Sequence, residues 1–317
     1  MGWGAPNPER VVKGAPEAFV LAIFGPTGSG KTAVAEALAE RIPAEIVSAD
    51  ALQVYDGLPI LTNQSGRPAR LVAIWPLDHE ASVGEYERLA HAAIDEVLAL
   101  GRTPIVAGGT GLYLRAALTN LRLPPPPPPG ARERLEALYD ELGPEGAHAE
   151  LADRDPAAAA AVHPNDRRRV VRALELAEAG ASLAPATDRL WSEETRRPTV
   201  LVGLDVPPEE LERRIEARTA AMFERGVEEE VARALARPLS RTARAVLGLE
   251  EIASLPREDA EREIVVRTRR YAAYQRKWMR RIPGLVTVRA DRPADEVADA
   301  ILEVARARQR VPARRAG

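Results

Sequence analysis

The chain contains no cysteine, which excludes a disulfide framework, a thiolate nucleophile and a zinc site built on cysteine. Only four scattered histidines occur in 317 residues, so a histidine-based metal site is not expected either. No run is apolar enough to resemble a signal peptide or a membrane span. We therefore expect a soluble, cytoplasmic protein with no membrane partner, and nothing in the sequence requires more than a monomer.

Lysine is also scarce: of the 44 lysine and arginine residues, only three are lysines. One of them, Lys31, lies in Gly25-Pro26-Thr27-Gly28-Ser29-Gly30-Lys31-Thr32, which matches the phosphate-binding pattern G-x-x-x-x-G-K-[ST] at every fixed position. In such a loop, backbone N–H groups and a helix N-terminus surround an anion, the lysine adds a full charge, and the Thr32 hydroxyl can bind magnesium. We predict that a di- or triphosphate binds here; a chance glycine-rich turn is the alternative.

Strand and helix patterns alternate around this loop. We predict strands at 19–24, 45–48, 70–75 and 104–107. We predict one helix that follows the loop and ends near residue 41, and two more at 84–100 and 112–118. This alternation indicates an α/β fold with a doubly wound parallel sheet, like that of P-loop NTPases. Because ligands bind at the carboxyl ends of such strands, we expect Asp50, which follows the second strand, at the same edge as the phosphate loop.

Six consecutive prolines, 124–129, interrupt the pattern and favour a stiff polyproline II segment or a solvated loop. Predicted helices follow at 131–142, 156–162 and 167–179, the last two capped by Asp155 and Asp166. A strand at 199–206, helices at 209–224, 227–236 and 259–281, and a strand at 285–288 resume the core. The expected organisation is a core in two parts, 17–122 and 199–305, a helical insertion at 123–198, and flexible tails at 1–16 and 306–317.

The formal net charge of −3 hides two basic clusters. The first is 167–172, directly after His163-Pro164-Asn165-Asp166. The second lies on the predicted helix 259–281, where arginines and Lys277 alternate with Tyr271, Tyr274 and Trp278. Arginine forks and aromatic rings suit the phosphates and unstacked bases of an RNA loop. A solvated helix face whose aromatics pack on the core is an equal alternative.

Two classes of function remain open from the residues alone. The first is a P-loop kinase of nucleotides or small molecules, in which the loop would bind ATP. The second is a group transferase that acts on RNA and uses the loop to hold a leaving pyrophosphate. A kinase needs a strand-borne acid for magnesium, and only Val47-Ser48-Ala49-Asp50 offers a weak version of that signal.

Several motifs together resemble the bacterial tRNA dimethylallyltransferases. The segments that carry the resemblance are 25–32, Ser48-Ala49-Asp50-Ala51-Leu52-Gln53-Val54-Tyr55, 108–116 (Gly-Gly-Thr-Gly-Leu-Tyr-Leu-Arg-Ala) and 163–175 (His-Pro-Asn-Asp-Arg-Arg-Arg-Val-Val-Arg-Ala-Leu-Glu), with weaker matches at 214–218 and 269–271. They occur in the family's order over most of the chain. The segment that begins at His163 is the most specific of them.

The resemblance implies transfer of a dimethylallyl group from dimethylallyl diphosphate to N6 of adenine 37, next to the anticodon, in tRNAs that read codons starting with U. The diphosphate would lie in the loop formed by Gly25, Pro26, Thr27, Gly28, Ser29, Gly30, Lys31 and Thr32, with Mg²⁺ at Thr32. Asp50 would be the general base. Thr110 would hydrogen-bond at the reacting centre, and Lys31 and Arg218 would stabilise the leaving group.

The same resemblance implies a contact with the anticodon stem-loop of tRNA. The residues expected there are Asp50, Ala51, Leu52, Gln53, Thr110, Arg132, Arg168, Arg169, Val170, Val171, Arg172, Tyr274, Gln275, Arg276, Lys277, Trp278 and Arg280. Two alternatives are an isopentenyltransferase acting on free AMP, ADP or ATP, and the P-loop kinase above.

The chain departs from the family's pattern in three places. Residues 59–65 read Pro-Ile-Leu-Thr-Asn-Gln-Ser where the family has Asp-Ile-Gly-Thr-Ala-Lys-Pro, and the next segment is shortened. Leu249-Glu250 replaces an aromatic and a basic residue, and Ala273-Tyr274 replaces two basic residues. We expect these changes to weaken contacts with tRNA or to shift substrate choice. The phosphate loop, Asp50 and Thr110, which the chemistry requires, are intact.

Overall fold

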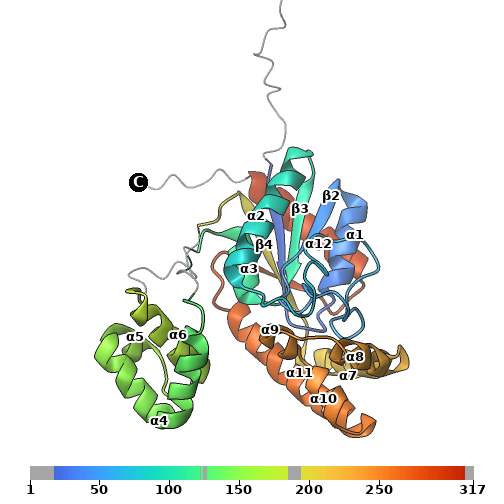
Figure 1. Cartoon of the computed structure of the whole chain (residues 1–317). Helices are drawn as coiled ribbons and strands as arrows, with labels where there is room; N and C mark the ends of the chain where they lie inside the picture. Colours follow the sequence, from blue (N-terminus) through green and yellow to red (C-terminus); the bar gives the residue numbers. More distant parts are fainter. Residues whose placement is uncertain (1–17, 122, 124–126, 185–193, 311–317) are drawn as a thin grey trace, which may run out of the picture. The chain divides into compact units, whose positions relative to one another are not determined.

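The computed structural model describes residues 18–121, 123, 127–184 and 194–310 (Figure 1). It divides into two compact units, which are treated separately below: unit 1 is Met1–Asn120 with Glu193–Gly317, and unit 2 is Leu121–Ser192. The predicted insertion, 123–198, overlaps unit 2. In the part of the chain that the structure describes, no helix is both long and apolar enough to span a membrane.

Unit 1 is built on a parallel sheet of five strands in the order β2-β3-β1-β4-β5. The strands are β1 Val20–Phe24, β2 Ala44–Ser48, β3 Thr103–Gly108, β4 Thr199–Asp205 and β5 Val286–Arg289. Every residue of the central strand β1 is buried, as expected for a parallel sheet covered on both faces. Phe24 is paired with Gly108 and Gly203, so the central strands end at one level. The predicted α/β fold is confirmed.

Helices cover both faces of this sheet, with α1 and α12 on one side and α2 and α3 on the other (Figure 1). The helices of unit 1 are α1 Lys31–Arg41, α2 Val83–Ala99, α3 Gly111–Leu118, α7 Pro208–Glu224, α8 Val227–Leu235, α9 Arg241–Arg244, α10 Leu249–Ser254, α11 Arg257–Met279 and α12 Ala294–Arg310. The short helices α9 and α10 were not predicted.

The flexible tail expected from residue 306 is wrong over its first part, because α12 continues to Arg310. Ile301 and Ala305 are buried in the core shared with α1, which holds the last turns of this helix in place. Residues 311–317 and the expected N-terminal tail, 1–16, lie outside the described residues.

The strand predicted at 70–75 is also wrong. Leu71 and Ala73 have positive φ angles of 64° and 52°, which an extended strand cannot contain. The segment instead folds against residues 53–54, where Ala73 N–H donates to the Gln53 carbonyl and Ile74 N–H donates to the Val54 carbonyl. Within this segment only Arg70 pairs with the sheet: its N–H donates to the Ile46 carbonyl and its carbonyl accepts from Ser48 N–H of β2. The residues after it leave the sheet, and Leu71 and Trp75 are buried.

Unit 2 consists of α4 Ala131–Arg154, α5 Pro156–Ala161 and α6 Arg167–Glu178. The predicted helix 131–142 is confirmed; Gly143, at φ 70° and ψ 176°, then kinks the chain, and a further helical stretch continues to Arg154. Both predicted caps are present, since Asp155 accepts a hydrogen bond from Ala158 N–H and Asp166 accepts one from Arg169 N–H. The unit has its own apolar core. Pro124–Pro126 of the proline run lie outside the described residues.

Candidate active site

The phosphate loop joins β1 to α1. Gly28 and Gly30 have φ angles of 82° and 85°, a backbone conformation that favours glycine, and they bend the loop back toward the first turn of α1. The Lys31 ammonium donates to the carbonyl oxygens of Gly25 at 2.9 Å and Pro26 at 2.8 Å, so it lies over the loop. An anion held by the loop amides would meet this charge directly.

Burial lowers the pKa of Lys31 to about 8; Asp50 opposes this shift and Arg218 adds to it. Two cations and a carboxylate therefore surround one small volume. A lysine that is desolvated in this way favours a bound anion, because a negative ligand restores the interactions that the ammonium loses with water.

Asp50 and Thr110 follow neighbouring strands, β2 and β3, and lie at the same edge of the sheet as the loop. The Asp50 carboxylate accepts a hydrogen bond from Leu52 N–H at 3.0 Å, which fixes the turn after β2. The Thr110 hydroxyl accepts one from Ala51 N–H at 3.2 Å and so ties the two strand ends together. A side chain at Gly108 would place its Cβ 2.0 Å from the Ala49 carbonyl oxygen, so only glycine permits this close approach.

Helix α11 locks these pieces to the loop through Gln275, which is 2% exposed. Its side chain accepts from Thr27 N–H at 2.8 Å and donates to the Gly109 carbonyl at 2.8 Å. One turn earlier, the Tyr271 hydroxyl lies 3.4 Å from the Thr110 hydroxyl. Burial, with a further contribution from Asp50, raises the pKa of Tyr271 to about 12, so this phenol stays protonated. The sequence placed Tyr271 only within a basic and aromatic cluster and missed its position at this site.

Helix α7 brings Arg218 to the phosphate loop. Its guanidinium donates to the Thr27 hydroxyl at 2.7 Å. Burial lowers the pKa of Arg218, while Asp50 opposes the shift. Arg214, one turn earlier, also lines the cleft, and neither the motif spacing nor the resemblance had singled it out as a site residue.

These elements enclose a cleft of about 380 Å³. Its polar wall contains Thr27, Lys31, Thr32, Asp50 and Arg218. Its apolar wall contains Leu52, Leu61, Ile215, Met222, Leu247 and Ile264. The cleft therefore suits a ligand that is anionic at one end and hydrocarbon at the other.

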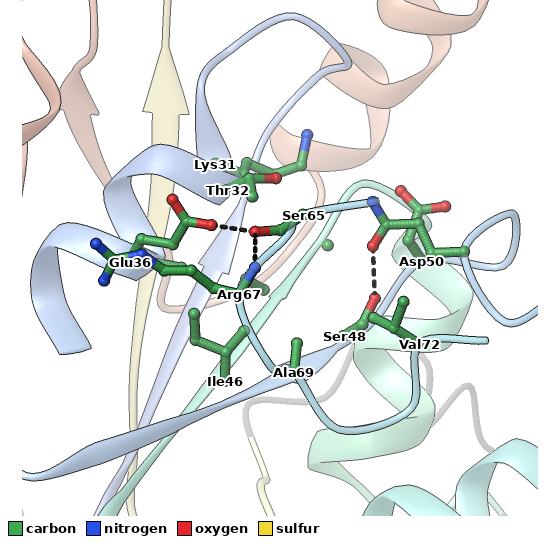
Figure 2. Close-up of a pocket in the computed structure, with 14 residues that line it drawn as sticks. Lys31, Thr32, Glu36, Ile46, Ser48, Asp50, Ser65, Arg67, Ala69 and Val72 are labelled. Carbon is green, nitrogen blue, oxygen red and sulfur yellow. Dashed lines mark hydrogen bonds between the residues drawn. The ribbon is translucent and has the colours of Figure 1, made fainter. Parts of the chain in front are cut away.

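A second, smaller pocket shares Lys31, Thr32, Asp50 and Gln53 with this cleft (Figure 2). Glu36 accepts a hydrogen bond from Ser65, and the Ser48 hydroxyl donates to the Gln53 side chain at 2.9 Å. Among the described residues, no group of three or more His, Cys, Asp and Glu side chains could hold a metal ion. A magnesium ion that keeps several waters and is held mainly by a diphosphate needs no such group, and the hydroxyl oxygen of Thr32 fits it.

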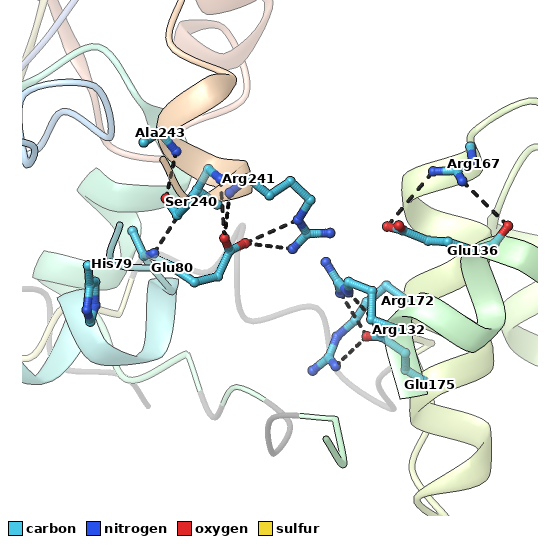
Figure 3. A network of polar contacts seen from close by, with 12 residues as sticks. His79, Glu80, Arg132, Glu136, Arg167, Arg172, Glu175, Ser240, Arg241 and Ala243 are labelled. Carbon is cyan, nitrogen blue, oxygen red and sulfur yellow. Dashed lines mark hydrogen bonds and ion pairs between the residues drawn. The ribbon is translucent and has the colours of Figure 1, made fainter. Parts of the chain in front are cut away.

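In unit 2 the predicted residues Arg132 and Arg172 both bind Glu175 (Figure 3). Burial raises the pKa of Glu175, but hydrogen bonds from Arg132 and Arg172 outweigh this effect and hold it below its usual value. Arg167 similarly bonds Asp140 at 2.8 Å. These ion pairs fix the helices of unit 2 against one another and order the basic side chains.

Three residues expected to contact tRNA have buried side chains. Val170 and Val171 belong to the core of unit 2, and Gln275 is occupied by Thr27 and Gly109. Their side chains therefore stabilise the protein, and a direct contact with tRNA is no longer expected from them. By contrast, Arg168, Arg169, Tyr274, Lys277 and Arg280 are exposed.

The remaining residues of the predicted set on α11 have partners within unit 1. Arg276 donates to Asp205 at 3.1 Å. The ring of Trp278 packs so closely on Gly111 that a Cβ there would lie 2.2 Å from it. Arg276 therefore holds α11 at the end of β4, and Trp278 holds it against α3.

Two family models match the sequence: IPP transferase over residues 53–282 and isopentenyl transferase over residues 18–71. A tRNA dimethylallyltransferase of Thermobifida fusca is 41% identical over 293 residues, which cover 86% of this chain and 91% of the relative. One from Anaeromyxobacter dehalogenans is 42% identical over 282 residues, covering 85% of this chain and 94% of the relative.

Solved structures agree with these relatives. A tRNA delta(2)-isopentenylpyrophosphate transferase of Staphylococcus epidermidis superposes with a TM-score of 0.66 at 27% identity, covering 92% of this chain and all of the other. A eukaryotic dimethylallyltransferase acting on tRNA superposes with a TM-score of 0.75 at 25% identity, covering 95% of this chain and 82% of the other. Since the sequence relatives span most of both chains at about 40% identity, the protein belongs to the tRNA dimethylallyltransferase family.

Proposed function

We propose that this protein transfers the dimethylallyl group of dimethylallyl diphosphate to N6 of adenine 37 in tRNAs that read codons starting with U. The observation that carries this proposal is the single cleft in which the phosphate loop, Asp50 and an apolar wall meet. Its cationic side chains, Lys31 and Arg218, suit a diphosphate, and its apolar lining residues suit a short hydrocarbon. The carboxylate between them suits deprotonation of an amine.

The first task of the site is to stabilise the leaving group. As the allylic C–O bond breaks, negative charge collects on the diphosphate, where Lys31, Arg218 and the loop amides face it. Preorganised charges of this kind stabilise a transition state without further reorganisation. Magnesium, when bound with the diphosphate at Thr32, supplies additional neutralising charge.

The second task is to make the exocyclic amine nucleophilic. As the new C–N bond forms, N6 loses a proton, and the Asp50 carboxylate accepts it. Thr110 lies beside this centre, linked to Ala51 N–H and close to the Tyr271 hydroxyl. This pair orients the amine while the C–O bond breaks and the proton moves to Asp50.

The acceptor must reach a cleft that side chains enclose. A base in a stacked anticodon loop cannot do so, so we expect adenine 37 to leave its stack, as substrates of base-modifying enzymes commonly do. The exposed basic side chains of each unit, including Arg168, Arg169, Lys277 and Arg280, would hold the phosphates of the anticodon stem-loop. We further propose that the protein acts as a cytoplasmic monomer.

Product analysis tests this function directly. Purified protein is incubated with dimethylallyl diphosphate, magnesium and unmodified tRNA that has adenine 37, and nucleosides of the digested RNA are identified by mass spectrometry. We expect N6-(dimethylallyl)adenosine, and its loss when EDTA removes magnesium. Parallel reactions contain AMP or ATP in place of tRNA. Prenylated AMP or phosphate transfer from ATP in these reactions, without prenylated tRNA in the first, would refute the proposal in favour of the adenylate enzyme or the kinase.

A further inference from the structure

Tyr274 is an exposed aromatic residue on α11, close to the candidate active site. Of the phenylalanines, tyrosines and tryptophans that the structure describes, it alone is exposed, at 55%. The Trp278 ring meets it at an angle of 64°, with the ring centroids 6.4 Å apart, so the two rings are not stacked. Trp278 therefore covers at most one face of the phenol, and the ring has area to bury against a ligand.

The position of Tyr274 relative to the cleft follows from the helix. Tyr271, three residues earlier, lines the cleft, and its hydroxyl lies 3.4 Å from that of Thr110. Three residues correspond to about 4.5 Å along α11 and to a rotation of about 60° around it. Tyr274 therefore lies beside the residues that mark the reacting centre, but it faces solvent.

Exposed cations flank Tyr274 on the same face of α11. Arg270 precedes it by four residues and Lys277 follows it by three, and both are exposed. Residues three and four apart are neighbours on the surface of a helix. From Ile264 to the end of α11 at Met279 the sequence contains no acidic residue. A ring between two cations suits single-stranded nucleic acid, whose phosphates bind the charges and whose bases stack on the ring.

The sequence departs from its family at this point. The tRNA dimethylallyltransferases have two basic residues where this chain has Ala273 and Tyr274, and both of these are exposed. Loss of two positive charges alone would weaken binding to a phosphate backbone. A tyrosine offers a contact of another kind, because every base has a face on which an aromatic ring can stack.

We propose that Tyr274 stacks on an unpaired base of the anticodon loop, next to adenine 37, in place of the phosphate contact that a basic residue would make there. This inference rests on the proposed function and assigns the kind of contact that Tyr274 makes. When adenine 37 enters the cleft, the base beside it in the strand loses a stacking neighbour. Tyr274 offers that base a new one, while Arg270 and Lys277 are placed to bind the phosphates around it.

Binding of anticodon stem-loops tests this contact without any chemistry. We expect Tyr274→Ala to lower the affinity for the unmodified stem-loop by roughly 5- to 100-fold, as is usual when a ring that stacks on a base is replaced by alanine. Tyr274→Phe keeps the ring and should restore the wild-type affinity. The slope of log affinity against log salt concentration should stay unchanged in Tyr274→Ala, whereas Lys277→Ala should make it shallower by about 1.

Stem-loops with an abasic nucleotide identify the partner of the ring. One lacks the base before adenine 37 and the other lacks the base after it, and each is bound to the wild-type protein and to Tyr274→Ala. Where the missing base is the stacked one, the loss of affinity caused by Tyr274→Ala should largely disappear, because both changes remove the same contact. Leu100→Ala is the control: this residue is 62% exposed and lies between α2 and the start of β3, whereas the cleft lies at the ends of the strands.

Unchanged affinity in Tyr274→Ala overturns the inference, and so does an equal loss in Tyr274→Phe. A loss that neither abasic stem-loop reduces also overturns it. Absence of prenyl transfer to a tRNA that the wild-type protein binds would instead refute the proposed function, while the binding measurements would still report on Tyr274.

Discussion

Asp50 is the residue on which the proposed chemistry depends most. One oxygen of its carboxylate accepts a hydrogen bond from Leu52 N–H, which holds it at the strand end, and the residue lines the cleft. An asparagine of the same shape would keep that hydrogen bond but could not accept a proton from N6. The Asp50→Asn substitution therefore distinguishes an effect on binding from an effect on proton transfer.

We expect Asp50→Asn to lower kcat by roughly 10²- to 10⁴-fold, the usual contribution of a general base. The dissociation constants for inorganic pyrophosphate and tRNA should change little, which calorimetry and filter binding can measure. Asp56→Asn, at an exposed aspartate six residues further on, serves as the control. An equal collapse of tRNA affinity in Asp50→Asn would identify Asp50 as a binding residue instead.

Lys31 predicts a specific pH dependence of anion binding. Its folded-state pKa is lowered to about 8, so the ammonium is present below that pH and is lost as the pH rises through it. The affinity of the free enzyme for inorganic pyrophosphate should therefore fall between about pH 7.5 and 9. Calorimetry across this range checks the expectation. Lys31→Arg, whose charge persists at these pH values, should flatten the profile; a wild-type profile that is already flat would contradict it.

At the scale of elements, α11 does the most to assemble the site. Tyr271, Gln275 and Trp278 lie on successive turns and contact Thr110, Gly109 and Gly111 respectively. The N-terminus of α3 and the phosphate loop are both positioned by this one helix. A change in the distance between α11 and α3 would therefore displace both the start of α3, with Thr110, and the phosphate loop.

Gly111→Ala tests this packing. The added Cβ would lie 2.2 Å from the Trp278 ring, so α11 and α3 would have to separate. Overpacking of this kind costs about 1–3 kcal/mol, which urea denaturation can measure. Gly66→Ala is the control, since nothing lies within 4 Å of its Cβ position. If the two variants were equally stable, the contact between Gly111 and Trp278 would not be a rigid one.

The departures from the family's pattern differ in their surroundings. At the start of α10, Leu249 is buried and Glu250 is exposed, while Ala273 and Tyr274 on α11 are both exposed. Leu61 and Gln64 occupy the altered segment 59–65 and line or brace the cleft. That these changes shift tRNA recognition stays a prediction. In the structure, Leu61, Thr62 and Asn63 of segment 59–65 also line the cleft.

At the scale of the whole molecule, charge is distributed over two units, each with its own core. A net charge of −3 would oppose RNA binding if it were spread evenly. Exposed arginines occur in unit 2 at Arg168 and Arg169, and exposed cations occur in unit 1 at Lys277 and Arg280. The proposed binding of tRNA phosphates by these groups would make tRNA affinity an electrostatic property of both units.

We expect the logarithm of the tRNA association constant to fall steeply and linearly with the logarithm of the salt concentration. Removing one phosphate contact, as in Arg168→Ala, should reduce the slope by about 1. Filter binding between 50 and 200 mM salt measures both quantities. Arg262→Ala, on the far end of α11, is the control. A slope that Arg168→Ala leaves unchanged would remove this arginine from the RNA contact.

The amino-acid sequence by itself determined the fold class, the phosphate loop and the edge at which Asp50 and Thr110 lie, because these follow from short-range patterns and from the geometry of parallel sheets. The helix N-caps at Asp155 and Asp166 were also predictable from the sequence, because capping depends on residues that are neighbours in the chain. Only the tertiary structure decided the rest. It brought Tyr271 and Gln275 to the loop from some 250 residues away, since hydrogen bonds such as Gln275 to Thr27 span 248 positions. It turned the chain away from the sheet after Arg70, through the left-handed residues Leu71 and Ala73. It also buried Val170, Val171 and Gln275, because which face of a helix is covered depends on its neighbours and not on its own composition.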